Sequence, residues 1–172
     1  MLFDDMERTG KIMWVIFWCL TLAALTYYFH DSITEKYNPN QVVESTISDR
    51  GKSIVLKQNR RGHYVANGSI NGESVTFLLD TGATLISIPA HLGKRLSLSK
   101  GKTYPVSTAN GSINVFATKI SSLEIGILRF NNIEGHLNPG MDGNIILLGM
   151  NALKHLELRQ VNNTLTLTIP TT

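Results

Sequence analysis

A chain of 172 residues is long enough for one domain with a sizeable hydrophobic core and one appended segment. The formal net charge of +3 comes from lysines and arginines scattered along the sequence, so no basic stripe indicates a nucleic-acid-binding protein. The single cysteine, Cys19, lies in an apolar segment, which argues against a disulfide framework, a zinc cluster and thiol catalysis.

The first pronounced feature along the chain is an uncharged apolar run at residues 12–29, which follows a polar start at residues 1–11. A helix needs about 20 mostly apolar residues to cross a bilayer, and this run is just long enough. Aromatic side chains, which favour the membrane interface, lie toward its two ends, at Trp14, Trp18, Tyr27 and Tyr28. We therefore expect a transmembrane signal anchor at residues 12–29.

The charges before this run favour one orientation of the anchor. Arg8 and Lys11 precede it, which favours a cytoplasmic N-terminus, although neighbouring acidic residues dilute the signal. The following domain would then lie on the far side of the membrane. A cleaved signal peptide is an alternative, but residues 23–28 contain no clean small-x-small cleavage site. A buried core helix is a further alternative and would need apolar surroundings on every side.

The next stretch, residues 30–60, is polar and mixed in charge, with a breaker at residues 38–40. We expect most of it to be a tether, with an extra strand at residues 54–56, and a removable pro-segment is a weaker alternative. From residue 61 onward the pattern is that of an all-β domain. Short helices are expected only at residues 90–96, after Pro89, and at residues 150–156.

The β pattern begins with a hairpin whose turn is Asn71-Gly72, the strongest short hairpin signal. Its second run, residues 74–79, ends directly in Asp80, Thr81 and Gly82. A carboxylate in this position is costly unless it is paired or hydrogen-bonded, and glycine permits a tight turn. The sequence therefore predicts a strand that delivers one carboxylate to the floor of a cleft.

Two later segments complete the pattern. Asn110-Gly111 joins two arms of modest apolar content, as expected of a projecting flap rather than a core hairpin. Residues 145–149 form an unbroken apolar run, typical of a strand that is buried on both faces. Asp142 lies just before this run in a loop rich in proline and glycine, where a solvated carboxylate is the better interpretation.

These motifs, in this order, resemble those of the single-domain, retropepsin-like aspartic proteases of the retroviral type, including membrane-anchored bacterial members. The resemblance covers residues 62–169 and depends on residues 79–83, the flap turn and residues 146–149. It implies an all-β, retropepsin-like β-barrel at residues 61–172 with one or two short helices, preceded by the transmembrane helix. It also implies a single-pass protein of a bacterial inner membrane with its protease domain on the periplasmic side.

The resemblance further implies a role for each motif. Asp80, Thr81 and Gly82 would be the catalytic motif of an endopeptidase that hydrolyses peptide bonds with an Asp-activated water and without a metal or other cofactor. The flap and substrate-binding residues would be Ala83, Ala109, Asn110 and Gly111. The residues supporting the site would be Leu147, Leu148 and Gly149.

This chemistry requires two carboxylates that share one proton, whereas the chain has a single Asp-Thr-Gly. We expect the second carboxylate to be Asp80 of another copy, so that the active form is a homodimer acting on polypeptide substrates. Anchoring both copies in one membrane would raise their effective concentration. Two alternatives remain: an inactive interaction module with the same fold, and an active monomer in which Asp142 completes the pair.

One departure from the retroviral pattern concerns the expected dimer. Retroviral enzymes carry an aspartate where Thr84 stands and an arginine where Met150 stands, and the two form a salt bridge near the dimer interface. Both charges are absent here, so no buried charge is left unpaired. Other contacts would therefore have to stabilise the dimer.

Overall fold

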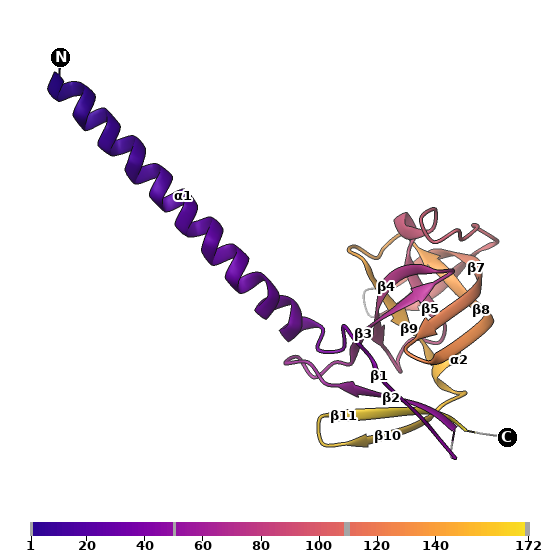
Figure 1. Ribbon diagram of the computed structural model, residues 1–172. Helices are drawn as coiled ribbons and strands as arrows, with labels where there is room; N and C mark the ends of the chain where they lie inside the picture. The colour runs from indigo at the N-terminus through magenta and orange to yellow at the C-terminus, as the bar shows by residue number, and fades with distance from the viewer. Residues whose placement is uncertain (1, 50, 109–110, 171–172) are drawn as a thin grey trace. The chain divides into compact units, whose positions relative to one another are not determined.

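The computed structural model describes residues 2–49, 51–108 and 111–170. The chain divides into two units, Met1–Lys36 and Tyr37–Thr172 (Figure 1). The first unit is the helix α1, Leu2–Tyr37, which continues to the first residue of the second unit. The second unit contains the β-strands.

Within α1, the segment Thr9–Tyr28 is long and apolar enough to cross a membrane, with a mean hydropathy of 1.5 over 20 residues and none of it buried. The hydroxyl groups of Thr21 and Thr26 are compatible with this apolar character because both are hydrogen-bonded within the helix. Thr21 Oγ1 donates to the Phe17 carbonyl and Thr26 Oγ1 to the Leu22 carbonyl, both at 2.8 Å. Hydroxyl groups in an apolar helix are commonly satisfied in this way.

The larger sheet of the second unit has seven strands in the order β3-β4-β9-β5-β8-β7-β6. An additional pairing between β3 and β7 closes it into a barrel. Its strands are β3 (Val65–Ile70), β4 (Glu73–Leu79), β5 (Ile86–Pro89), β6 (Thr103–Thr108), β7 (Gly111–Ile125), β8 (Leu128–Asn138) and β9 (Ile145–Leu148). The β4–β9 and β5–β8 pairs are parallel, whereas the hairpin pairs are antiparallel.

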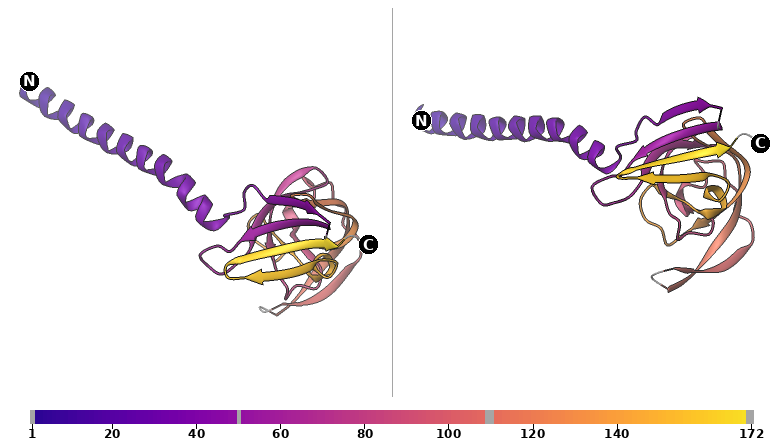
Figure 2. Two further views of the ribbon diagram at one scale, coloured as in Figure 1. Left: turned by 60° about the horizontal axis from the view of Figure 1, so that its bottom comes forward. Right: turned by 90° about the horizontal axis from the view of Figure 1, so that it is seen from below.

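A four-stranded antiparallel sheet packs beside this barrel, in the order β1-β2-β11-β10. Its strands are β1 (Glu44–Ser48), β2 (Gly51–Lys57), β10 (Glu157–Val161) and β11 (Thr164–Pro170) (Figure 2). The buried side chains of its two central strands, Ile54, Leu56, Leu165 and Leu167, join those of the barrel in one hydrophobic core. Burying each such side chain contributes about 1.5–3 kcal/mol.

The structure confirms the expected all-β barrel with two short helical elements, the 3₁₀ helix η1 (Ala90–Leu92) and α2 (Met150–Leu153). Both are shorter than the sequence indicated. The first predicted hairpin is also confirmed: Ile70 pairs with Glu73, and Asn71 and Gly72 between them have φ of 51° and 85°. Asparagine and glycine are the residues that tolerate such positive φ values in a two-residue turn.

The expected tether at residues 30–60 differs from the structure, because its second half supplies β1 and β2. The breaker at residues 38–40 is also bound to the barrel. The side chain of Asn40 donates to the carbonyls of Lys57 and Val65 at 2.9 and 2.7 Å and accepts the Lys57 amide at 2.7 Å. The polar composition was misleading because a buried asparagine can replace backbone hydrogen-bond partners.

The expectation that residues 145–149 are buried on both faces is wrong for one face of the strand. Ile146 and Leu148 are fully buried, whereas Ile145 and Leu147 are only half-buried. Side chains alternate between the two faces of a strand. Leu147 therefore points away from the core, and it lines a cavity described below.

Candidate active site

The loop that follows β4 is held by hydrogen bonds from both its backbone and its carboxylate. The Asp80 amide donates to the Leu148 carbonyl at 3.1 Å, and the Ala83 amide donates to the Asp80 carbonyl at 3.2 Å. The carboxylate oxygen Oδ1 of Asp80 accepts the Gly82 amide at 2.8 Å. Asp80 is half-buried, and the hydrogen bond from Gly82 orients its carboxylate.

Strand β9 and the start of α2 hold the other end of this loop. The Met150 amide donates to the Ala83 carbonyl at 2.7 Å, and the Asn151 amide donates to the Thr84 carbonyl at 3.0 Å. Amides in the first turn of a helix have no partner within the helix, so these two are available for the loop. The pairing of β4 with β9 places Leu79 opposite Leu148 just before both strands end.

Gly149 makes this close packing possible. A Cβ atom at this position would collide with the Leu85 carbonyl oxygen and would lie 2.8 Å from the Ala83 carbonyl oxygen. Both obstacles are backbone atoms, which cannot move aside as a flexible side chain can. A glycine is therefore required for the loop and the strand end to meet.

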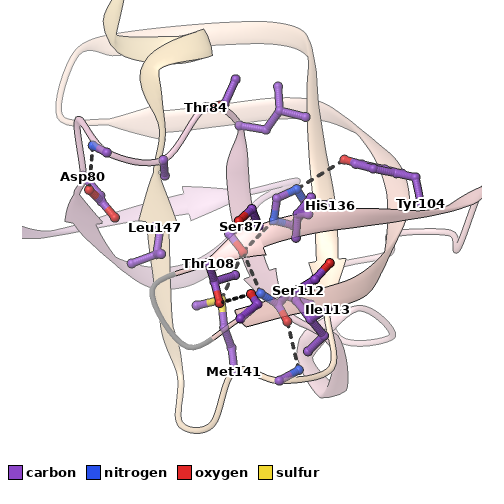
Figure 3. A pocket seen from close by; sticks show the side chains of 18 residues that line it. Asp80, Thr84, Ser87, Tyr104, Thr108, Ser112, Ile113, His136, Met141 and Leu147 are labelled. Carbon is purple, nitrogen blue, oxygen red and sulfur yellow. Dashed lines mark hydrogen bonds between the residues drawn. The ribbon is translucent and has the colours of Figure 1, made fainter.

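A cavity of about 930 Å³ opens beside Asp80 (Figure 3). The Asp80 loop, β5, the β6–β7 hairpin, the end of β8 with the loop that follows it, and Leu147 of β9 line it. Among the described residues that line the cavity, Asp80 has the only carboxyl side chain. Asp142 is exposed and is not part of the lining.

The β6–β7 hairpin forms one wall of the cavity and projects from the rest of the unit (Figure 2). Thr108 pairs with Gly111 across its turn, and Thr108 Oγ1 donates to the Gly111 carbonyl at 2.8 Å. The predicted hairpin is thus confirmed, while the expected tip residues Ala109 and Asn110 lie outside the described residues. Ile113 of the hairpin lies so close to Gly140 that a Cβ there would collide with it.

A row of hydrogen-bonded polar side chains that the sequence interpretation missed also lines the cavity, running from Tyr104 of β6 to β8 and β5. Tyr104 Oη lies 3.3 Å from His136 Nδ1, and His136 Nε2 lies 2.8 Å from Ser87 Oγ. Ser87 Oγ donates to Met141 Sδ at 3.1 Å and accepts from Asn138 Nδ2 at 3.5 Å. All five residues line the cavity, and Figure 3 labels four of them, Tyr104, His136, Ser87 and Met141. The available signal was Ser87, a polar residue within an apolar strand sequence; His136 lies in a mostly polar sequence and gave no such signal.

Burial determines the ionisation of this row of side chains. Burial lowers the pKa of the His136 imidazole below its usual value. Burial also raises the pKa of the Tyr104 phenol, and the nearby Glu134 carboxylate raises it further. Both side chains are therefore uncharged at neutral pH.

Apart from Ala109 and Asn110, which lie outside the described residues, the residues singled out from the sequence fall into three groups. Asp80, Gly82, Ala83, Gly111 and Leu147 line the cavity. Leu148 and Gly149 are buried beneath the Asp80 loop, whereas Thr81 is exposed and does not line the cavity. Over the described ranges, no group of three or more His, Cys, Asp or Glu residues is arranged to hold a metal ion.

A barrel of this topology, with an Asp-Thr-Gly loop held by an apolar strand ending in glycine and faced by a β-hairpin, defines a retropepsin-like aspartic protease. The family model described as "gag-polyprotein putative aspartyl protease" matches residues 66–155. The chain belongs to this family of retropepsin-like aspartic proteases.

One solved structure carries this similarity further: the crystal structure of a retropepsin-like aspartic protease from Rickettsia conorii. It is 30% identical in sequence, has a TM-score of 0.57, and the match covers 73% of this chain and 93% of that one. An uncharacterised protein of Rickettsia prowazekii is 26% identical over 153 residues, and one from a Sinorhizobium species is 25% identical over 126 residues. The matches cover 84% and 72% of this chain but only 64% and 54% of these relatives.

Proposed function

We propose that this chain is an aspartic endopeptidase in which Asp80 is the catalytic carboxylate and Thr81 and Gly82 complete its motif. The observation that carries the proposal is the position of Asp80 as the one carboxyl side chain on a cavity of about 930 Å³, among the described residues. A β-hairpin forms one wall of this cavity, where it could cover a bound peptide. Family membership supports the same chemistry.

The reaction needs a second carboxylate close to Asp80. Two carboxyl groups at short distance cannot both ionise easily, so they share one proton and titrate as a pair. The ionised member takes a proton from a water molecule, which attacks the carbonyl carbon of the peptide bond. The protonated member donates its proton to the carbonyl oxygen, and proton transfer to the nitrogen then allows the C–N bond to break.

The second carboxylate belongs, in this proposal, to Asp80 of another copy, so the active form is a symmetric homodimer. The single carboxyl group of the described cavity lining supports a site that is half complete. Exposed groups surround it: Thr81 and Thr84 are exposed, and Met150 is 36% exposed although it is apolar. Neither retroviral salt-bridge residue is present, which leaves this surface uncharged at Thr84 and Met150.

We further propose that residues 12–29 anchor the protein as a single membrane-spanning helix, with the N-terminus in the cytoplasm and the barrel on the periplasmic side of a bacterial inner membrane. The support is the apolar segment Thr9–Tyr28, its lack of buried side chains and its internally bonded threonines. Arg8 and Lys11 before the segment support the orientation.

The test compares the full-length protein in mild detergent with its Asp80→Asn variant, using a mixed peptide library and mass spectrometry of the products. We expect the variant to lose peptide cleavage by a factor of about 10²–10⁴, because asparagine cannot exchange the proton. Asp142→Asn is the matched control and should keep full activity. Circular dichroism would show that both variants remain folded.

Sedimentation in the same detergent tests the dimer, with activity measured on each fraction. Cleavage should follow the dimer. Cleavage by Asp80→Asn would contradict the catalytic role of Asp80, and an active monomer that needs Asp142 would contradict the dimer. A folded wild-type protein that cleaves nothing in the library would favour an inactive interaction module.

A further inference from the structure

The polar wall, which we define as Tyr104, His136, Ser87, Asn138 and Met141, lies in the same cavity as Asp80. Its central members are strongly buried: Ser87 is 4% exposed, His136 8% and Asn138 7%. They come from neighbouring parallel strands, since β5 and β8 pair with Ser87 opposite His136. Polar groups at this depth are costly unless they are hydrogen-bonded, and these groups bond to one another.

The hydrogen atoms along the wall can be assigned by counting donors. Ser87 has one hydrogen, which it donates to Met141 Sδ, so its oxygen accepts from His136 Nε2 at 2.8 Å. The neutral His136 ring has one N–H, so its Nδ1 accepts from the Tyr104 hydroxyl at 3.3 Å. Donation therefore runs in one direction, from Tyr104 through His136 and Ser87 to Met141.

The last acceptor in this series of hydrogen bonds, Met141 Sδ, is the weakest one. A thioether sulfur is a poor hydrogen-bond acceptor compared with a carbonyl oxygen. A ligand carbonyl near Ser87 could therefore accept the hydrogen bond from the Ser87 hydroxyl. Breaking the weak bond to Met141 Sδ would cost little free energy. At the other end, the Tyr104 oxygen donates its hydrogen and keeps lone pairs that can accept an N–H. The wall thus offers one donor and one acceptor to an uncharged group.

We propose, resting on the proposed function, that the polar wall is a subsite for a substrate side chain with a carboxamide, glutamine or asparagine. The carboxamide oxygen accepts from Ser87 Oγ in place of Met141 Sδ, and the carboxamide nitrogen donates to the Tyr104 oxygen. The protease would then select its cleavage sites by this side chain.

Charge and polarity disfavour the other classes of side chain. Among the described residues that line the cavity, none is a lysine or arginine, and Asp80 is the only carboxylate. A glutamate would be desolvated there without a cation, close to another acid. An aliphatic side chain would cover the Ser87 hydroxyl without offering it an oxygen. Sites that hydrogen-bond their substrates discriminate strongly against analogues that lack the bond.

The experiment uses the full-length protein in detergent and peptides that are identical except at one position near the cleaved bond. That position carries glutamine, glutamate or methionine, which have similar lengths, and it is moved along the peptide in turn. At one position, we expect kcat/KM for glutamine to exceed that for methionine by about tenfold or more. Ser87→Ala should reduce this ratio to near one, mainly by lowering kcat/KM for the glutamine peptide.

Two further variants separate recognition from a structural effect. Ser87→Thr keeps the hydroxyl on a strand that favours β-branched residues, and it should restore the preference for glutamine. Met141→Leu removes the competing sulfur, and it should retain or increase the preference. A ratio that Ser87→Ala leaves unchanged, or a preference for methionine at every position, would overturn the subsite while leaving Asp80-dependent proteolysis intact.

A binding measurement keeps the two proposals separable. The Asp80→Asn protein is titrated with the glutamine and methionine peptides while the His136 ring signals are followed by NMR. Stronger binding of the glutamine peptide, with a shift of the His136 signals that Ser87→Ala abolishes, supports the subsite even if no cleavage is found. Equal binding of both peptides without such a shift overturns it.

Discussion

The two sides of the cavity are built in different ways. The Asp80 loop is a short contiguous motif, and a second contiguous motif, residues 146–149, holds it through backbone hydrogen bonds. The polar wall consists of single side chains from separate elements: Ser87 and His136 are 49 residues apart and meet only because β5 and β8 pair in parallel. Chemistry fixed by the backbone depends on few side chains, whereas chemistry built from separate side chains can change by single substitutions.

The largest effect on stability and cleavage is expected from Gly149→Ala, which tests the side of the cavity formed by the Asp80 loop. The added methyl group would collide with the Leu85 carbonyl oxygen, so the Asp80 loop or β9 must shift. We expect a loss of about 3 kcal/mol in the free energy of unfolding, together with loss of peptide cleavage. Urea denaturation would measure the first and the library assay the second.

Gly10→Ala is the control for adding a methyl group, because a Cβ there meets nothing within 4 Å. It should leave both the unfolding free energy and cleavage unchanged. Full cleavage activity in Gly149→Ala would show that the loop does not depend on this close packing.

A second prediction extends the comparison to the segment before the barrel. Asn40→Ala would leave the Lys57 amide and the Val65 carbonyl without the partners that the side chain provides. We expect a loss of about 2 kcal/mol in unfolding free energy, with the cleavage preference unchanged. Gln41→Ala, at an exposed neighbouring position, should cost less than about 0.5 kcal/mol. Equal stability of the two variants would mean that residues 38–40 behave as the tether that their composition suggested.

A smaller loss of stability is expected from a substitution in the polar wall. Tyr104→Phe removes the hydroxyl that lies 3.3 Å from His136 Nδ1 and keeps the ring. We expect a loss of about 1 kcal/mol or less in unfolding free energy, because Tyr104 is only half-buried and water can replace it. Preference for glutamine over methionine should fall while cleavage of the methionine peptide persists. If both peptides were affected equally, Tyr104 would act on the Asp80 side instead.

The smallest expected effect concerns pH. Burial lowers the pKa of His136 in the folded protein, so below a pH of about 6.5 the unfolded chain binds this proton more readily than the folded chain does. His136 therefore contributes a loss of stability as the pH falls below that value, and none above it. Replacing it with glutamine should make the unfolding free energy less dependent on pH between 7.5 and about 5.

The exposed His63 provides the matched control for this measurement. His63→Gln should keep the wild-type pH dependence. The neighbouring groups Tyr104 and Glu134 and the cavity carboxylate Asp80 are present in both variants, so the comparison isolates the replaced histidine. A steeper pH dependence in His136→Gln would contradict the burial of a neutral ring.

The contiguous motifs were predictable from sequence because their signals are local. Asn71-Gly72 fixes a turn by its own φ preferences. An aspartate directly after an apolar strand is conspicuous because burying an unpaired carboxylate costs free energy. The role of Asn40 was not predictable, because its partners at Lys57 and Val65 are remote in sequence. The same holds for Ser87 and His136, whose meeting depends on the strand order of the whole barrel.

The length of β7 has a mechanical consequence for the hairpin wall. This strand runs through 15 residues, pairs with β6 as far as Phe116, and pairs with β8 from Phe116 onward. No loop separates the part of β7 that pairs only with β6 from the part that pairs with β8. The hairpin therefore has no flexible hinge at its base. The base of the hairpin lies at Phe116, which pairs with both neighbouring strands. The Lys100 ammonium lies 4.8 Å from the centre of the Phe116 ring. Moving this hairpin away from the cavity would therefore require the continuous strand β7 to bend.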